Sequence, residues 1–110
     1  MNAIEKLRKN GIALNYNDIS RLCKKYYVVE LSVFGSATWD NADGNGGLGF
    51  LVSFEAGAKI TLFDVIDLER EFSWLLNRKV EIVEKASLKN PVRRNRILAE
   101  EETVYAASWK

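Results

Sequence analysis

Two segments with alternating side chains constrain the fold of this chain most. From Tyr26 to Phe34 the residues are β-branched or aromatic, with Val29, Leu31 and Val33 on one face and Val28, Glu30, Ser32 and Phe34 on the other. From Leu48 to Phe54, the residues Leu48, Phe50, Val52 and Phe54 alternate with Gly49, Leu51 and Ser53. Both patterns predict strands. The loop between them, Ala37 to Gly46, contains Asp-Gly and Asn-Gly, which predicts a connection between antiparallel strands.

Small residues stand at both ends of this loop. Gly35-Ser36 ends the first strand, and Gly47 and Gly49 open the second. Because strand side chains repeat with period two, positions 47 and 49 project to the same face, where two carboxylates could share one cation. In this chain both positions are glycine.

This arrangement resembles the minimal nucleotidyltransferases of the DNA polymerase beta superfamily, whose signature is Gly-Ser, about ten residues, and Asp-x-Asp on the next strand. The resemblance covers Val28 to Tyr105 and includes these segments: Phe54–Lys59, the helix from Leu62 onward, Arg78–Val83 and Ile97–Glu100. It implies a nucleotidyltransferase fold of the α+β, two-layer α/β kind, with a mixed sheet of three or more strands packed with about four helices.

The resemblance also implies roles for site residues. Gly35 and Ser36 would cradle the triphosphate of ATP through backbone N–H groups and the hydroxyl. Gly47 and Gly49 stand at the positions of the two metal-binding aspartates, and Glu81 stands at the position of a third carboxylate. Trp39 and Asp40 stand where the family usually has a basic residue and a glycine, so the loop also departs from the family pattern.

The glycines decide what chemistry to expect. The family's reaction uses ATP and two Mg²⁺ ions, and loss of one positioned catalytic group commonly lowers the rate by about 10²- to 10⁴-fold. We therefore expect a catalytically degenerate protein, a pseudoenzyme in which metal binding is weak or lost. Mg²⁺ often takes only one or two ligands from protein, so docking of Mg-ATP through Glu81 and water stays open. The alternative is an active Mg-dependent adenylyltransferase that transfers AMP to a protein partner with Glu81 and Asp40 or Asp43.

The resemblance further implies a partner. Minimal nucleotidyltransferases of this kind are often paired, as antitoxins, with small helical HEPN proteins, which act as toxins. We expect an antitoxin-like module that binds such a protein, with residual nucleotide affinity at Gly35 and Ser36; a homo-oligomer stays open. Trp74 and Trp109 are candidate interface residues, although Trp74 could equally cover a helix edge.

The remaining elements complete the scaffold. Apolar spacing predicts helices over Ala3–Asn10, over Asp18–Lys25 with Asn17 as the cap, and over Leu62–Leu76 between Thr61 and Asn77. A strand over Lys79–Glu84 should lie parallel to the second strand, beside the glycine pair. Asn90-Pro91 predicts a last helix that runs to about Glu102. Its basic group is more often an exposed helix face than a phosphate, nucleic-acid or partner contact: Lys89, Arg93, Arg94 and Arg96.

The amino-acid composition limits the functions that this chain can have. With 110 residues, 47% of them hydrophobic, we expect one nucleotidyltransferase-like domain over residues 1–110. A net charge of +1 gives no overall case for nucleic acid or an anionic membrane. The absence of histidine excludes histidine-based nucleophilic catalysis and histidine-ligated zinc. The lone Cys23 is a small core residue, and no signal peptide or membrane span is predicted, so we expect a cytoplasmic protein.

Overall fold

The computed structural model describes residues 2–39 and 46–108 and shows an α+β fold. Within these residues, four α-helices accompany one mixed sheet of four strands in the order β3-β2-β1-β4. The helices are α1 (Ala3–Lys9), α2 (Tyr16–Lys25), α3 (Leu62–Leu76) and α4 (Pro91–Glu100), and the strands are β1 (Val28–Phe34), β2 (Leu48–Phe54), β3 (Val80–Glu84) and β4 (Glu102–Ala106). Two short 3₁₀ turns, Ser36–Thr38 and Lys85–Ser87, follow β1 and β3. The predicted fold class is confirmed.

The sheet combines antiparallel and parallel pairs. β1 pairs with both β2 and β4 in antiparallel orientation, and β2 pairs with β3 in parallel orientation. The parallel register sets Gly49 opposite Glu81. This confirms that the strand after α3 brings its carboxylate beside the glycines.

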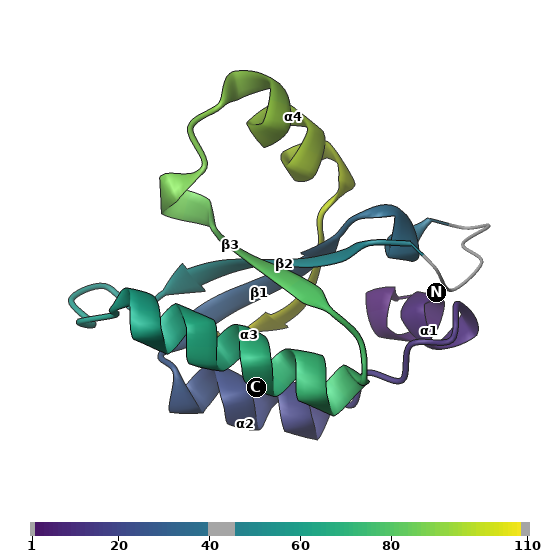
Figure 1. The fold of residues 1–110 in the computed structure, drawn as a ribbon, viewed down its shortest axis with the longest axis horizontal. Helices are drawn as coiled ribbons and strands as arrows, with labels where there is room; N and C mark the ends of the chain where they lie inside the picture. Colours follow the sequence, from purple (N-terminus) through teal and green to yellow (C-terminus); the bar gives the residue numbers. More distant parts are fainter. Residues whose placement is uncertain (1, 40–45, 109–110) are drawn as a thin grey trace.

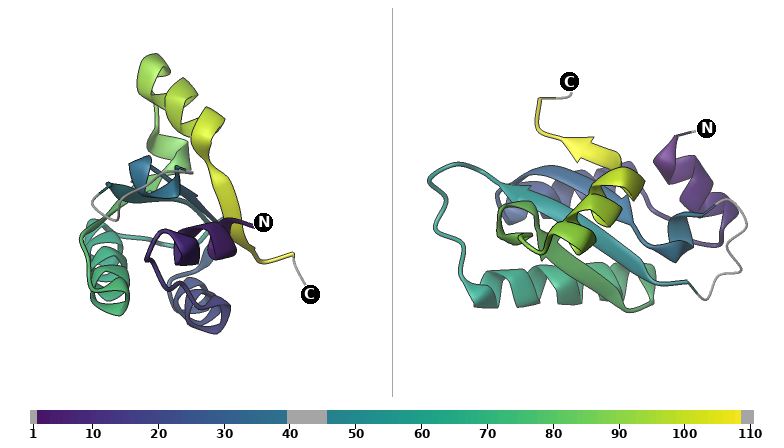
Figure 2. Two further views of the ribbon diagram at one scale, coloured as in Figure 1. Left: turned by 90° about the vertical axis from the view of Figure 1, so that its right-hand side faces the viewer. Right: turned by 90° about the horizontal axis from the view of Figure 1, so that it is seen from above.

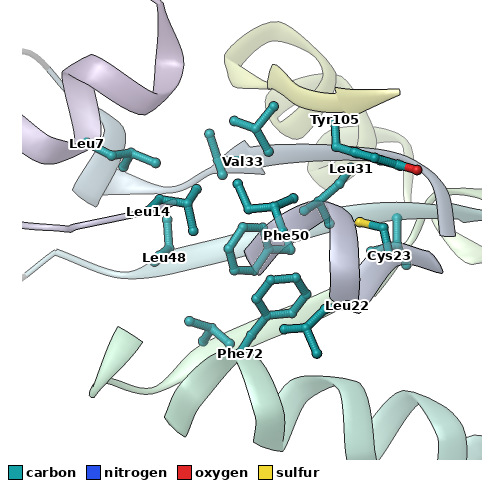
Figure 3. Close-up of a cluster of buried hydrophobic side chains, with 14 of the residues drawn as sticks. Leu7, Leu14, Leu22, Cys23, Leu31, Val33, Leu48, Phe50, Phe72 and Tyr105 are labelled. Carbon is teal, nitrogen blue, oxygen red and sulfur yellow. The ribbon is translucent and has the colours of Figure 1, made fainter. Parts of the chain in front are cut away.

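Helices α2 and α3 lie on one side of the sheet and α4 lies on the other (Figures 1 and 2). The large core fills the side of α2 and α3, where the rings of Phe50 and Phe72 stack with their centroids 4.6 Å apart (Figure 3). Cys23 is fully buried in this core, as predicted, and burial raises the pKa of its thiol to about 12. On the α4 side the structure shows a smaller buried cluster of Phe34, Leu51, Leu88 and Ile97. The period-two pattern of β2 therefore divides its side chains between two unequal cores.

The longest helix begins and ends where the sequence predicts. The Thr61 side chain accepts a hydrogen bond from the Asp64 backbone N–H, and the Asp64 carboxylate accepts one from the Thr61 backbone N–H, which forms a capping box. At the other end, Asn77 has φ 50° and ψ 44°, the left-handed conformation that often ends helices. Both predicted ends of α3 are confirmed.

Two local predictions are wrong. Helix α2 begins two residues earlier than expected, because the Asn15 side chain, rather than that of Asn17, accepts from the free backbone N–H groups of the first turn. Strand β1 begins at Val28 rather than Tyr26, since Tyr27 has φ 59°. An irregular register between Val28 and Glu30 also turns Val28 into the large core, away from the face predicted for it.

The last helix is shorter than predicted. It ends at Glu100, and residues Glu102–Ala106 form β4 on the open edge of β1. Val104 and Tyr105 from this strand are buried in the large core. The sheet is therefore wider than the three strands that the sequence pattern located. Within residues 2–39 and 46–108, no helix has the length and apolar character needed to cross a membrane.

Candidate functional site

The turn after β1 is held by backbone contacts that require glycine. Gly35 has φ 104°, and a Cβ at this position would collide with the carbonyl group of Gly47. A Cβ at Gly46 would lie 2.6 Å from the Ser36 Oγ. The Ala37 N–H donates to the Gly47 carbonyl at 3.0 Å, and the Gly47 N–H donates to the Ser36 Oγ at 3.0 Å. The turn is therefore joined directly to the residues that lead into β2.

A buried side chain at the C-cap of α1 supports the same turn. The Nδ2 of Asn10 donates to the carbonyl oxygens of Ala37, at 3.0 Å, and Trp39, at 2.9 Å. The Thr38 Oγ1 donates to the Gly35 carbonyl at 2.7 Å. The sequence interpretation assigned Asn10 only to the end of a helix. A buried amide that satisfies two carbonyls of a distant turn has no local sequence signal.

The two glycines assigned to the metal positions have different surroundings. Gly47 is exposed, and a Cβ added there would meet no atom within 4 Å. Gly49 is buried beneath the ring of its cross-strand partner Phe34, and a Cβ added there would lie 2.6 Å from Cε1 and Cε2 of that ring. An aspartate therefore fits at position 47 and meets the Phe34 ring at position 49.

The carboxylate of Glu81 pairs with the guanidinium group of Arg93. Its Oε1 lies 2.5 Å from a guanidinium nitrogen of Arg93 on α4, and the two side chains are 56% and 50% exposed. Among the residues that the structure describes, no three His, Cys, Asp or Glu side chains come together to form a metal site. Asp40 and Asp43 lie outside the described residues. The described residues therefore do not fit a two-metal centre, and the metal role of Glu81 stays a prediction.

The predicted basic group is divided by the fold. Arg93 pairs with Glu81, and Arg94 turns to the carbonyl of Leu88 at 3.3 Å. Arg93 and Arg96 reach the turn after β1 and line a pocket of about 300 Å³ with Gly35 and Ser36. The rest of the lining is Phe34, Trp39, Ile97 and Glu100. The sequence suggested an exposed basic helix face, and the fold brings two of its residues beside the predicted phosphate cradle.

A second surface lies on the outer face of α3. Trp74 is 83% exposed, so it does not cover the helix edge, the alternative left open for it. Other large apolar side chains of this helix are also exposed: Leu62, Phe63 and Ile66. Exposed apolar patches are typical of interaction surfaces. Trp109, the other predicted interface residue, lies outside the described residues.

Solved structures share this architecture. A toxin–antitoxin structure with AMP-PNP matches with a TM-score of 0.67 at 16% identity, over 86% of this chain and 76% of that chain. An MNT antitoxin in complex with the tri-AMPylated HEPN toxin of Shewanella oneidensis matches with a TM-score of 0.61 at 14% identity, over 91% of this chain and 72% of that chain. These likenesses define the nucleotidyltransferase fold.

A solved structure with higher sequence identity to this chain defines the family. A structure provisionally named a minimal nucleotidyltransferase is 31% identical to this chain, with a TM-score of 0.63, over 92% of this chain and 94% of that one. The chain belongs to the minimal nucleotidyltransferase family. No family model matches the sequence, and no curated protein matches it either.

Proposed function

We propose that this chain is an antitoxin-type module that neutralises a HEPN-type protein by binding it, without transferring a nucleotide. Its family membership and the MNT–HEPN complex among its structural neighbours support the choice of partner. The absence of catalysis is supported above all by Phe34, whose ring occupies the space that a side chain at position 49 would need. The Arg93–Glu81 pair also supports the absence of catalysis. Glu81 is the one carboxylate left among the three metal-binding positions of the family, and a guanidinium group, rather than a metal ion, pairs with it.

The outer face of α3 is the contact surface that we assign to this partner. Phe63, Ile66 and Trp74 offer apolar area, and the ion pair between Asp67 and Arg70 lies on the same helix. Aromatic side chains of this kind commonly dominate binding energy, while charges at the rim select the partner. The HEPN-type protein should therefore present an apolar patch to this face.

A transfer assay tests the absence of catalysis. The protein is incubated with Mg²⁺, ATP labelled on the α-phosphate, and a HEPN-type protein encoded in the adjacent reading frame. We expect the chain to form a complex and suppress the toxicity of the partner while no label enters the partner. Label transfer by the unmodified chain, abolished by Glu81→Ala, would establish the adenylyltransferase alternative.

A gain-of-function variant makes the same test sharper. Gly47→Asp and Gly49→Asp restore the two carboxylates, and Phe34→Val is needed with them because the ring blocks position 49. Label transfer should appear with the triple variant and not with Phe34→Val alone, which is the matched control. If the triple variant folds, binds the partner and still transfers nothing, the assignment of positions 47 and 49 to the metals is wrong.

A further inference from the structure

Four exposed side chains form one row along the outer face of α3. This outer row consists of Phe63, Asp67, Arg70 and Trp74. At 3.6 residues per turn, the four positions fall within about 60° of the helix circumference. The two aromatic residues are 77% and 83% exposed, and the two charged side chains are 54% and 76% exposed. Helix α3 lies at the edge of the molecule in both views of Figure 2, so a second protein can reach this row.

The outer row has the same pattern in both directions along the helix. Its spacings are four, three and four residues, with an aromatic ring at each end and opposite charges in the middle. Alternating spacings of three and four are those of the contact positions between two helices that pack side by side. If a second α3 lies antiparallel about a two-fold axis between positions 68 and 69, Phe63 faces Trp74 of the second copy. In the same register, Asp67 faces Arg70 of the second copy.

The charges favour this orientation over a parallel one. Within one chain, Asp67 and Arg70 form an ion pair with 3.8 Å between Oδ1 and Nη1. Antiparallel packing adds a second arginine beside each carboxylate, so the four charges alternate in sign. Parallel packing would set each charge against its own copy, and like charges across an interface are costly. The row is therefore complementary to itself in one arrangement only, as a two-fold interface requires.

We propose that two copies of this chain pair through the outer row of α3 in the antiparallel orientation, and that the HEPN-type protein binds this face only after the pair separates. The second half rests on the proposed function, which assigns the same face to that protein. At 1.5 Å per residue the row is roughly 16 Å long, so the interface is small and the pair is reversible. Pairing covers the exposed aromatic side chains while the HEPN-type protein is absent.

Charge reversal tests the pairing without a change in the core. Asp67→Arg leaves two positive charges in the row, and Arg70→Asp leaves two negative charges. Sedimentation velocity of either variant alone should show dimerisation weakened about tenfold or more, because like charges then meet across the axis. An equimolar mixture of the two variants should recover the dimer. Arg21→Asp is the matched control, since it breaks a similar exposed pair with Asp18 on α2, and it should leave dimerisation unchanged.

The sedimentation experiment has clear outcomes. The unmodified chain should pass from monomer to dimer as its concentration rises through the micromolar range. A monomer at every concentration up to the millimolar range would overturn the proposal. A dimer that survives both single reversals would overturn it as well, because the contact would then lie elsewhere. A mixture of the two variants that stays monomeric would exclude the antiparallel register.

A locked pair tests the competition with the HEPN-type protein. Asp67→Cys and Arg70→Cys in one chain should allow disulfides across the pair and keep both aromatic residues, while Cys23 is buried and stays out of the reaction. The oxidised dimer should not bind the HEPN-type protein encoded in the adjacent reading frame, and reduction should restore binding. A locked dimer that binds as well as the reduced chain would overturn the shared face.

The two proposals fail in different ways. If the unmodified chain binds the HEPN-type protein but never pairs with itself, this inference alone is wrong. If the chain pairs with itself but does not bind the HEPN-type protein, the proposed function alone is wrong.

Discussion

The two faces of the sheet differ in what holds them together. Toward α2 and α3, a large cluster of fully buried side chains packs around Phe50 and Phe72. Toward α4, the buried cluster of the described residues is small, with Val83 and Leu98 packed against it, and a charged pair and a pocket lie beside it. The first face carries the stability of the fold. The second holds the residues of the candidate site: Gly35, Ser36, Gly49 and Glu81.

Truncation in the large core tests this contrast with the largest expected effect. Phe72→Ala removes the stacked ring opposite Phe50 and should lower the free energy of unfolding by about 3–5 kcal/mol. Urea denaturation followed by circular dichroism measures the change. Phe34→Ala, the matched truncation on the α4 side, should cost clearly less because its cluster is smaller. Equal losses in the two variants would remove the contrast between the faces.

The two glycines give a sharper comparison within one strand. Gly49→Asp places a charged side chain against the Phe34 ring and should lower the unfolding free energy by about 2 kcal/mol or more. Gly47→Asp enters open space and should change it by less than about 0.5 kcal/mol. In a double-mutant cycle, the cost of Gly49→Asp should fall when Phe34 is replaced by valine. An unchanged cost would mean that the ring does not block this position.

The seam between α2 and α3 predicts a pH dependence. The hydrogen bond from the Tyr26 hydroxyl holds the pKa of Glu71 below its ordinary value, so its contribution to stability is present above that value and is lost as the pH falls through the lowered pKa. Burial, with Glu71 beside it, raises the pKa of Tyr26 to about 12, so its contribution is lost as the pH rises from about 10 through 12. Unfolding free energies measured across both ranges should show a flatter acid limb for Glu71→Gln than for the unmodified chain. The same slope in both proteins would contradict the pairing.

The outer face of α3 should show the smallest effect on stability. Trp74→Ser replaces a side chain that is 83% exposed and should change the unfolding free energy by less than about 0.5 kcal/mol. The same change should weaken binding to the HEPN-type partner about tenfold or more, since an exposed tryptophan is a common interface anchor. Val92→Ser, at a 79% exposed position on α4, is the matched control and should leave binding unchanged. Equal binding by both variants would place the contact elsewhere.

The sequence predicted the large-core face well because periodicity shows which side chains share one face of a strand or helix. The alternation in Leu48–Phe54, the apolar stripe of Leu62–Leu76 and the ends at Thr61 and Asn77 are all observed. Here local pattern and tertiary structure agree, so short-range reasoning is sufficient.

The α4 face was less predictable because its features depend on contacts between distant residues. The antiparallel pairing places Phe34 over Gly49, and nothing near either residue in the sequence specifies this contact. The direction of α4 decides which arginines meet Glu81 and the turn after β1, and the apolar spacing of a helix does not reveal that direction. β4 was not located from the sequence because its five residues follow a helix directly and no turn signal marks where the strand begins.

The two hydrogen bonds from Asn10 tie the entrance of the pocket to the first helix of the chain. A substitution that loosens α1 would therefore displace the turn after β1 from a distance, although α1 contributes no residue to the pocket lining. Asn10→Asp replaces the amide donor with a carboxylate of the same size and would test this connection between α1 and the turn.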